Sequence, residues 1–104
     1  MAKIAAKKPQ NKTECVNPNS GSRLNIDTET YQLFRTAIKQ SLAVGKAITF
    51  TELVDGIKKY LKSKKIIFKK SVGWYAVIVK NDLEVKKIIE TYTEKGIKLH
   101  RLKD

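Results

Sequence analysis

Eight lysines gather in one stretch of the chain that contains no acidic residue. The stretch runs from Gly56 to Asn81. Ammonium groups at this density neutralise phosphates, and such contacts give affinity for nucleic acid without reading base sequence. The stretch therefore predicts a phosphate-binding surface, with an ordinary solvated face as the alternative. The eight residues are Lys58, Lys59, Lys62, Lys64, Lys65, Lys69, Lys70 and Lys80.

The overall charge agrees with this prediction. The chain has 104 residues, with 22 lysines and arginines against 10 aspartates and glutamates, and a formal net charge of +12. Such a surface attracts polyanions over roughly 8–10 Å, the Debye length at moderate salt. Duplex DNA is the first expected partner, and an acidic protein or an acidic membrane surface is compatible with the same charge.

Base recognition would fall to residues 71–87, which follow the connector lysines and which we expect to be helical. Asn81 is the strongest candidate, because asparagine makes paired hydrogen bonds to adenine. The segment has no arginine, which removes the commonest contact to guanine. Nonspecific phosphate binding is therefore better supported than sequence readout. The other residues opposite the apolar arc of this helix, or at its start, are Lys70, Ser71, Trp74, Val77 and Ile78.

Three of these side chains are apolar and support a second hypothesis. Trp74, Val77 and Ile78 would form an exposed patch, and such patches often mark protein interfaces. The alternative function is a protein-interaction module that forms a homodimer or binds an acidic protein. A third interpretation places Trp74 in the core.

The sequence contains few of the residues that catalysis or metal binding requires. Cys15 and His100 are the only cysteine and the only histidine, too few for an ordinary four-ligand zinc site. The sequence has no Walker loop, dinucleotide fingerprint or HExxH motif. We expect no enzyme activity, no cofactor and no metal. The single cysteine and the lack of a signal peptide or a long apolar run favour a cytoplasmic protein without membrane spans.

The chain divides into a tail and one domain. Residues 1–19 are basic and hold few large apolar side chains, so little surface offsets the entropy of ordering them. We expect a flexible tail there, followed by a single domain over residues 20–104. A hydrophobic fraction of 41% is enough for one small core at this length.

Three helices are expected within the domain. The first begins at Asp27 or Thr28, either of which can cap it, and ends near Gly45. The second begins at Thr49, because Thr49 and Glu52 have the spacing of a capping box, and runs to about residue 62. Ser71 can cap the third, which extends to about residue 87. Residues 23–26 are expected to form a brief strand or extended arm before the first helix.

The end of the chain predicts a β-hairpin. Residues 88–93 and 97–102 are β-prone runs separated by a short turn that contains Gly96. Lys95, Lys98 and Arg101 place three positive charges on this hairpin, where they would reach a phosphate backbone. His100 is expected at its surface.

Several local sequence patterns resemble those of a known group of protein domains. Residues 82–90 have a leucine–glutamate pair followed by an apolar pair and a charge, and this run resembles the junction of recognition helix and wing in winged helix-turn-helix DNA-binding domains. Residues 72–75 and 17–21 resemble a small bacterial winged-helix family of uncharacterised function, and the similarity covers about residues 16–101. Lys87 stands where a glycine commonly ends the recognition helix.

The resemblance implies an α+β, mainly α, fold: a three-helix winged helix-turn-helix with a C-terminal β-hairpin wing. It also implies that the protein binds DNA, as transcriptional regulators with this fold do. The predicted contact surface combines the basic connector between helices two and three, the third helix and the wing. Its residues are Lys62, Lys64, Lys65, Lys69, Lys70, Ser71, Trp74, Lys80, Asn81, Lys95, Lys98 and Arg101.

Overall fold

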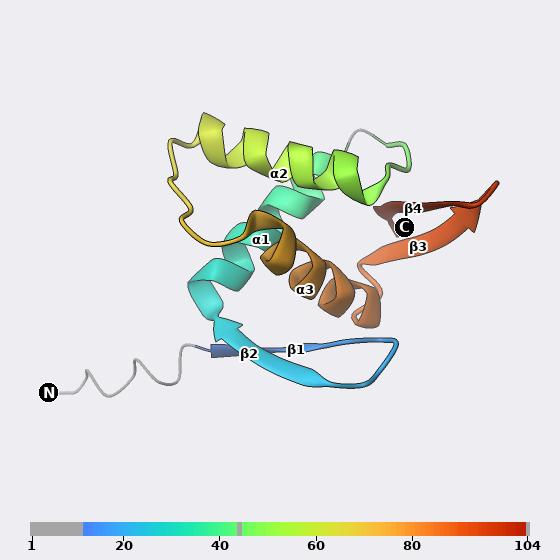
Figure 1. Cartoon of the computed structure of the whole chain (residues 1–104), viewed down its shortest axis with the longest axis horizontal. Coiled ribbons are helices and arrows are strands. Elements are labelled where there is room, and N and C mark those ends of the chain that lie inside the picture. Colours follow the sequence, from blue (N-terminus) through green and yellow to red (C-terminus); the bar gives the residue numbers. More distant parts are fainter. Residues whose placement is uncertain (1–11, 44, 104) are drawn as a thin grey trace, which may run out of the picture.

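The computed structural model describes residues 12–43 and 45–103 and has an α+β fold. Three helices form the body, and one antiparallel hairpin precedes them while another follows them (Figure 1). The α+β class, the three helices and the C-terminal hairpin were predicted from the sequence, whereas the first hairpin was not. The elements are β1 (Lys12–Val16), β2 (Arg23–Asp27), α1 (Thr28–Leu42), α2 (Phe50–Ser63), α3 (Val72–Val85), β3 (Ile89–Glu94) and β4 (Ile97–Leu102).

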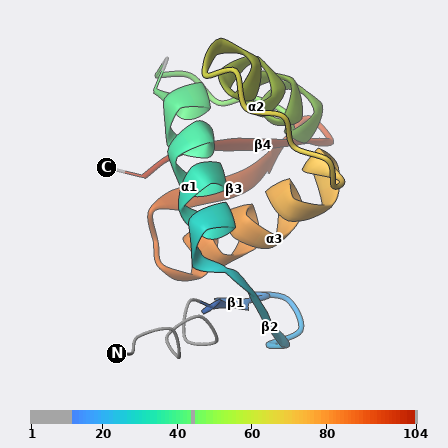
Figure 2. The same cartoon turned by 90° about the vertical axis from the view of Figure 1, so that its left-hand side faces the viewer.

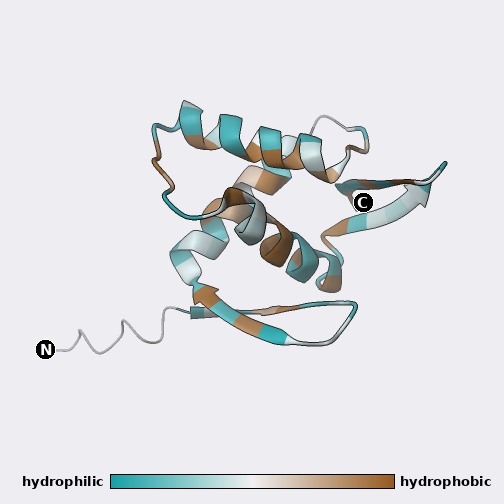
Figure 3. Cartoon of the chain, viewed as in Figure 1, coloured by the Kyte–Doolittle hydropathy of each residue, from teal (hydrophilic) through white to brown (hydrophobic). Residues whose placement is uncertain are grey.

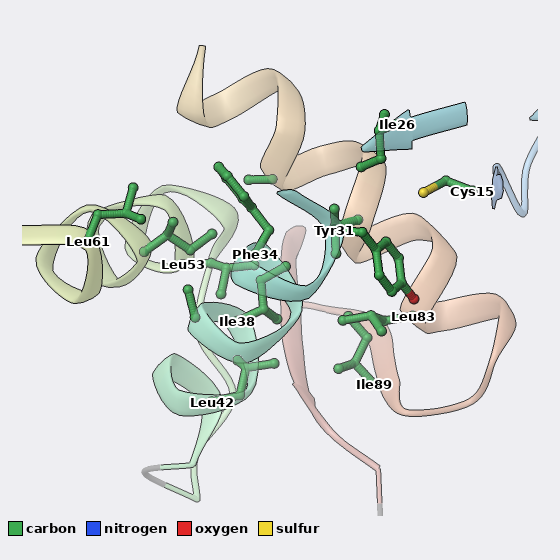
Figure 4. Packing of buried hydrophobic residues seen from close by; sticks show 14 of the residues in the cluster. Cys15, Ile26, Tyr31, Phe34, Ile38, Leu42, Leu53, Leu61, Leu83 and Ile89 are labelled. Atoms are coloured by element: carbon green, nitrogen blue, oxygen red, sulfur yellow. The ribbon is translucent and has the colours of Figure 1, made fainter. Parts of the chain in front are cut away.

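The core lies where the three helices meet (Figure 4). Phe34 of α1 is fully buried, and its ring centroid lies 4.9 Å from that of Phe68 and 5.9 Å from that of Tyr75. Aromatic pairs at these separations add to the stabilisation that burial itself gives. The other large, fully buried apolar side chains include Ile38, Leu42, Leu53, Ile57, Val79, Leu83 and Ile89.

Two helix starts follow the predicted caps. The Glu52 backbone N–H donates to Thr49 Oγ1 at 3.2 Å, and the Glu52 carboxylate accepts from the Thr49 N–H at 2.9 Å, so the capping box of α2 is confirmed. Ser71 Oγ accepts from the Trp74 N–H at 3.1 Å at the start of α3. Asp27 precedes α1 but makes no side-chain capping bond, because its carboxylate pairs with Lys12 instead.

Lysines occupy the residue after the C-cap of α2 and of α3, where glycine is usual. Lys65 has φ +57° and Lys87 has φ +62°, both in the left-handed region. The following N–H groups, of Ile66 and Ile88, donate back to the carbonyls of Leu61 and Leu83 at 2.9 Å. This is the Schellman arrangement, which normally selects glycine because a side chain is strained there.

The expected flexible tail differs from the structure at residues 12–16, which form β1. This strand pairs with β2 from Lys12–Asp27 to Val16–Arg23. Cys15 and Ile26 are buried, and the Val16 N–H donates to Asp82 of α3. The tail prediction missed this strand because its stabilising contacts come from residues far along the chain. Residues 1–11 of the expected tail lie outside the described residues.

The C-terminal hairpin pairs Ile89 with Leu102 and Glu94 with Ile97. Its two-residue turn, Lys95 and Gly96, has positive φ at both positions, as a type I′ turn requires. A backbone bridge between Ile48 and His100 joins this hairpin to the segment just before α2. The hairpin is therefore held to the helical body rather than projecting freely.

Candidate nucleic-acid interface

The strongest basic surface lies at the end of α2 and in the connector, residues 64–71. Seven lysines of this region are exposed, and none takes part in the five ion pairs found among residues 12–43 and 45–103. Figure 3 shows the outer side of α2 as hydrophilic, with its hydrophobic residues turned toward the body. The structure thus keeps these charges at the surface. They are the connector lysines Lys64, Lys65, Lys69 and Lys70 and the α2 lysines Lys58, Lys59 and Lys62.

Three of these lysines and several apolar side chains line a shallow depression of about 420 Å³. Lys58, Lys62 and Lys65 contribute to its walls. Ile67 also lines it and is 84% exposed. The remaining lining residues are Leu61, Ile66, Phe68 and Val72. Nothing in the local sequence distinguishes the exposed Ile67 from its neighbours Ile66 and Phe68, which pack against the core.

The first turn of α3 adjoins the connector. Trp74 is 49% exposed, and its ring contacts that of Tyr75 edge-on at 4.8 Å. Lys70 Nζ lies 5.9 Å from the Tyr75 ring centroid, within the range of a cation–π contact. Lys70, Ser71 and Trp74 therefore lie close together at the surface, and the interpretation that placed Trp74 in the core is wrong.

Lys80 does not belong to this surface, which corrects the prediction. Its side chain is 8% exposed, and its Nζ lies 2.6 Å from Glu84 Oε2 one helical turn away. A buried ammonium needs a partner, because transfer from water is costly for a charge. The Lys80 ammonium is paired inside the protein and is therefore not accessible to a phosphate.

Asn81 and Ile78 face the first hairpin, so the predicted base-reading side of α3 is partly covered. A cavity of about 110 Å³ separates them from β1 and β2. Val77 is half-buried as well. The sequence placed these residues on the side of α3 away from the core, but Ile78 packs against the core and β1 packs against α3. The protein-interaction hypothesis depended on an exposed patch formed by Trp74, Val77 and Ile78. Of these three side chains only Trp74 is exposed.

The residues of the C-terminal hairpin, which was predicted to be a wing, lie apart from the connector. In Figure 1 the β3–β4 turn stands at one end of the long axis and the connector lies toward the other. Lys95 and Lys98 are exposed. Arg101 forms an ion pair with Glu90, and its guanidinium lies 5.2 Å from the Tyr92 ring centroid. The predicted site residues therefore form two groups rather than one.

His100 is buried in the hairpin, and its predicted surface position is wrong. Its side chain is 1% exposed, and its Nδ1 lies 2.8 Å from Thr91 Oγ1. Thr91 Oγ1 also donates to Glu84 Oε2 at 2.7 Å, which links His100 to the Lys80–Glu84 pair. Burial, together with the nearby positive charge of Lys80, lowers the pKa of His100 to about 4. The imidazole is therefore neutral near pH 7.

A second internal network fastens the first hairpin to α3. Asp82 is 1% exposed; it accepts from the Tyr31 hydroxyl at 2.7 Å and from the Val16 N–H at 3.1 Å. Lys86 Nζ lies 2.7 Å from the same carboxylate and 4.7 Å from the Tyr31 ring centroid. Nothing in the residues near Asp82 in the sequence indicates that this carboxylate is buried. Its role is to hold β1 in place.

Among the described residues, no cluster of three or more histidine, cysteine, aspartate or glutamate side chains is arranged to hold a metal ion. The helices within residues 12–43 and 45–103 are also too short or too polar to cross a bilayer.

The fold and this surface define a small α+β protein with a basic face between its second and third helices. The chain belongs to a family of unknown function (DUF6958), whose model matches residues 12–99. No curated protein and no solved structure gives a match.

Proposed function

We propose that this protein binds duplex DNA through its phosphates, with the lysines of α2 and the connector as the main contacts. The observation that carries the proposal is the set of seven exposed lysines, residues 58–70, on a segment without a carboxylate. Neutralising phosphates with such groups releases counterions, which provides most of the affinity in nonspecific binding. Ser71 and Trp74 extend this surface onto the start of α3.

The arrangement of elements supports a winged helix-turn-helix interpretation, which is part of the proposal. Two helices joined by a connector are followed by a hairpin, and the Ile48–His100 bridge adds a short third strand to that hairpin. In such domains the helix after the connector meets the groove. Here β1 covers part of α3, so we infer that the connector and the first turn of α3 approach the DNA while Asn81 does not.

Two further parts of the proposal concern the wing and the compartment. Lys95 and Lys98 would give a secondary contact when the DNA extends along the molecule.

The free thiol of Cys15 is buried and forms no disulfide, which is compatible with the reducing cytoplasm where DNA of a bacterial cell lies.

The proposal is tested by titrating the protein into a fluorescent duplex at several salt concentrations. If about four to six phosphates are neutralised, the slope of log K against log salt is about −4 to −5. A slope near zero, or no binding at low salt, contradicts the proposal. A concentration-dependent dimer that is abolished by Trp74→Ala, together with indifference to DNA, would support the protein-interaction alternative instead.

Two charge-reversal variants, each with three substitutions, test whether the connector is the DNA-binding surface. Changing Lys65, Lys69 and Lys70 to glutamate should weaken binding to all duplex sequences and flatten the salt slope. The matched control changes the exposed residues Lys39, Lys46 and Lys103 to glutamate, which alters the net charge equally but at the ends of α1 and β4. Equal losses in both triple variants would show that overall charge, rather than the connector, determines binding.

A further inference from the structure

Ile67 is the most exposed of the large apolar side chains in the described part of the chain. It is 84% exposed, whereas Ile97 is 53% and Trp74 is 49% exposed. Water contact with so much apolar surface is unfavourable, and a contiguous polar rim around an apolar group often marks a binding site. Figure 3 shows this hydrophobic stretch of the connector between hydrophilic segments.

The residues on either side hold Ile67 in this exposed position. The Ile66 N–H donates to the Leu61 carbonyl at 2.9 Å, and Ile66 packs against the core. The Phe68 ring lies edge-on to Phe34 at 4.9 Å and to Tyr75 at 5.4 Å. Because both neighbours are anchored, the outward direction of Ile67 is fixed by the fold. A side chain fixed in this way loses little conformational entropy on binding.

The charges around Ile67 fit one kind of partner. Lys64 and Lys65 precede Ile66 and Phe68 in the chain, and Lys69 and Lys70 follow them, so along the connector the exposed Ile67 stands between two pairs of exposed lysines. The minor groove of DNA presents the complementary arrangement, with base steps between two phosphate backbones about 6 Å apart. A lipid surface is matched by several exposed apolar side chains on one face, and the connector offers Ile67 alone at such exposure.

We propose that Ile67 inserts from the minor groove between two base pairs and kinks the duplex, while the connector lysines bind the flanking phosphates. This inference rests on the proposed DNA-binding function and specifies its groove and its effect on DNA. Apolar wedges of this kind unstack a base step and bend DNA by about 20° or more. Pyrimidine–purine steps unstack most easily, so the protein prefers duplexes that carry a central TA step.

The test measures bending and affinity on one duplex. A 30-base-pair duplex with a central TA step carries a donor and an acceptor dye at its ends, and energy transfer rises when the protein bends it. The wild-type protein is expected to raise the transfer, and netropsin, which occupies the minor groove, is expected to block this rise. Ile67→Ala should remove the bend and weaken binding to this duplex about tenfold while the salt slope stays unchanged.

Two variants provide the controls. Ile67→Met keeps a large apolar side chain and should restore bending, whereas Ile97→Ala removes a similar exposed residue from β4 and should change neither bending nor affinity. Salt-dependent binding without a bend, with Ile67→Ala equal to wild type, overturns this inference and leaves the DNA-binding proposal standing. Absence of salt-dependent DNA binding overturns both. If Ile67→Ala loses binding to phosphatidylserine vesicles but not to DNA, the partner is a lipid surface and the inference is wrong.

Discussion

Lys80 Nζ lies 2.6 Å from Glu84 Oε2 in the interior, between α3 and the C-terminal hairpin. Thr91 of β3 donates to the same carboxylate oxygen, and His100 of β4 contacts Thr91. One carboxylate thus links α3, β3 and β4, and Figure 2 shows α3 lying beside the hairpin. A lysine that the charge pattern assigned to DNA therefore stabilises the fold.

Replacing Glu84 by glutamine should destabilise the protein by about 3 kcal/mol, because it leaves the Lys80 ammonium buried without an anionic partner. Urea unfolding followed by tryptophan fluorescence measures the change. Lys80→Met is the control: it removes the buried charge and keeps a similar volume, so its loss of stability should be smaller. At a temperature where Lys80→Met is folded, its DNA affinity should equal that of the wild type, and a clear loss would place Lys80 in the interface after all.

Two glycine substitutions separate stability from binding. Lys65→Gly and Lys87→Gly should each raise the free energy of unfolding by about 1 kcal/mol, because each relieves a side chain at positive φ. Only Lys65→Gly should also weaken DNA binding, since Lys65 borders the depression of the proposed interface. Denaturant titration and the fluorescence binding assay give the two readouts. Equal effects of the two variants on affinity would contradict the assignment of the interface.

Acidification should destabilise the protein through His100. Burial holds the folded-state pKa at about 4, below the ordinary value of 6.5, so the unfolded state binds the proton more tightly. The stabilising contribution is complete above about pH 6.5 and is lost as the pH falls toward 4, on the order of 3 kcal/mol in all. The charges nearest the imidazole are Lys80, Glu84 and Lys98.

Urea unfolding at pH 7, 5.5 and 4.5 measures this dependence. Carboxylates titrate over part of the same range, so His100→Gln serves as the reference: it retains a group that can bond to Thr91 and lacks the titration. The difference in stability between the two proteins should narrow as the pH falls. A constant difference would mean that His100 titrates normally and is more exposed than the structure shows.

Asp82→Asn should loosen the first hairpin, because it removes the charge that pairs with Lys86 and weakens the contacts to Val16 and Tyr31. The expected loss of stability is about 2 kcal/mol. Cys15 reports the opening directly. Burial, together with the negative charge of Asp82, raises the pKa of its thiol to about 11, so the thiol should react slowly with a disulfide reagent at pH 8.

The variant should react at least several times faster than the wild type under native conditions. Tyr31→Phe, which removes the hydroxyl's hydrogen bonds to Asp82 and Lys86 and leaves the Val16 contact in place, should produce a smaller increase. Identical rates in all three proteins would show that Asp82 does not hold the hairpin closed.

The parts of the fold that can be predicted from the sequence are those stabilised by contacts between residues close together in the chain. The capping box of Thr49 and Glu52 and the cap at Ser71 depend on residues three positions apart, so their spacing is visible in the sequence. Gly56 shows the opposite case. A methyl group at this position would lie 2.5 Å from Ser41 Oγ on the neighbouring helix, a constraint that nothing near Gly56 in the sequence indicates.

The sequence by itself determined the basic stretch, the starts of the second and third helices and the C-terminal hairpin, because charge density, capping and alternation are properties of neighbouring residues. Tertiary structure alone decided that Lys80 and His100 are buried, that Ile67 is exposed, and that β1 covers part of α3. The contact between Val16 and Asp82 joins residues 66 positions apart. Burial of a given side chain depends on which distant segments pack over it, and local patterns carry little information about that choice.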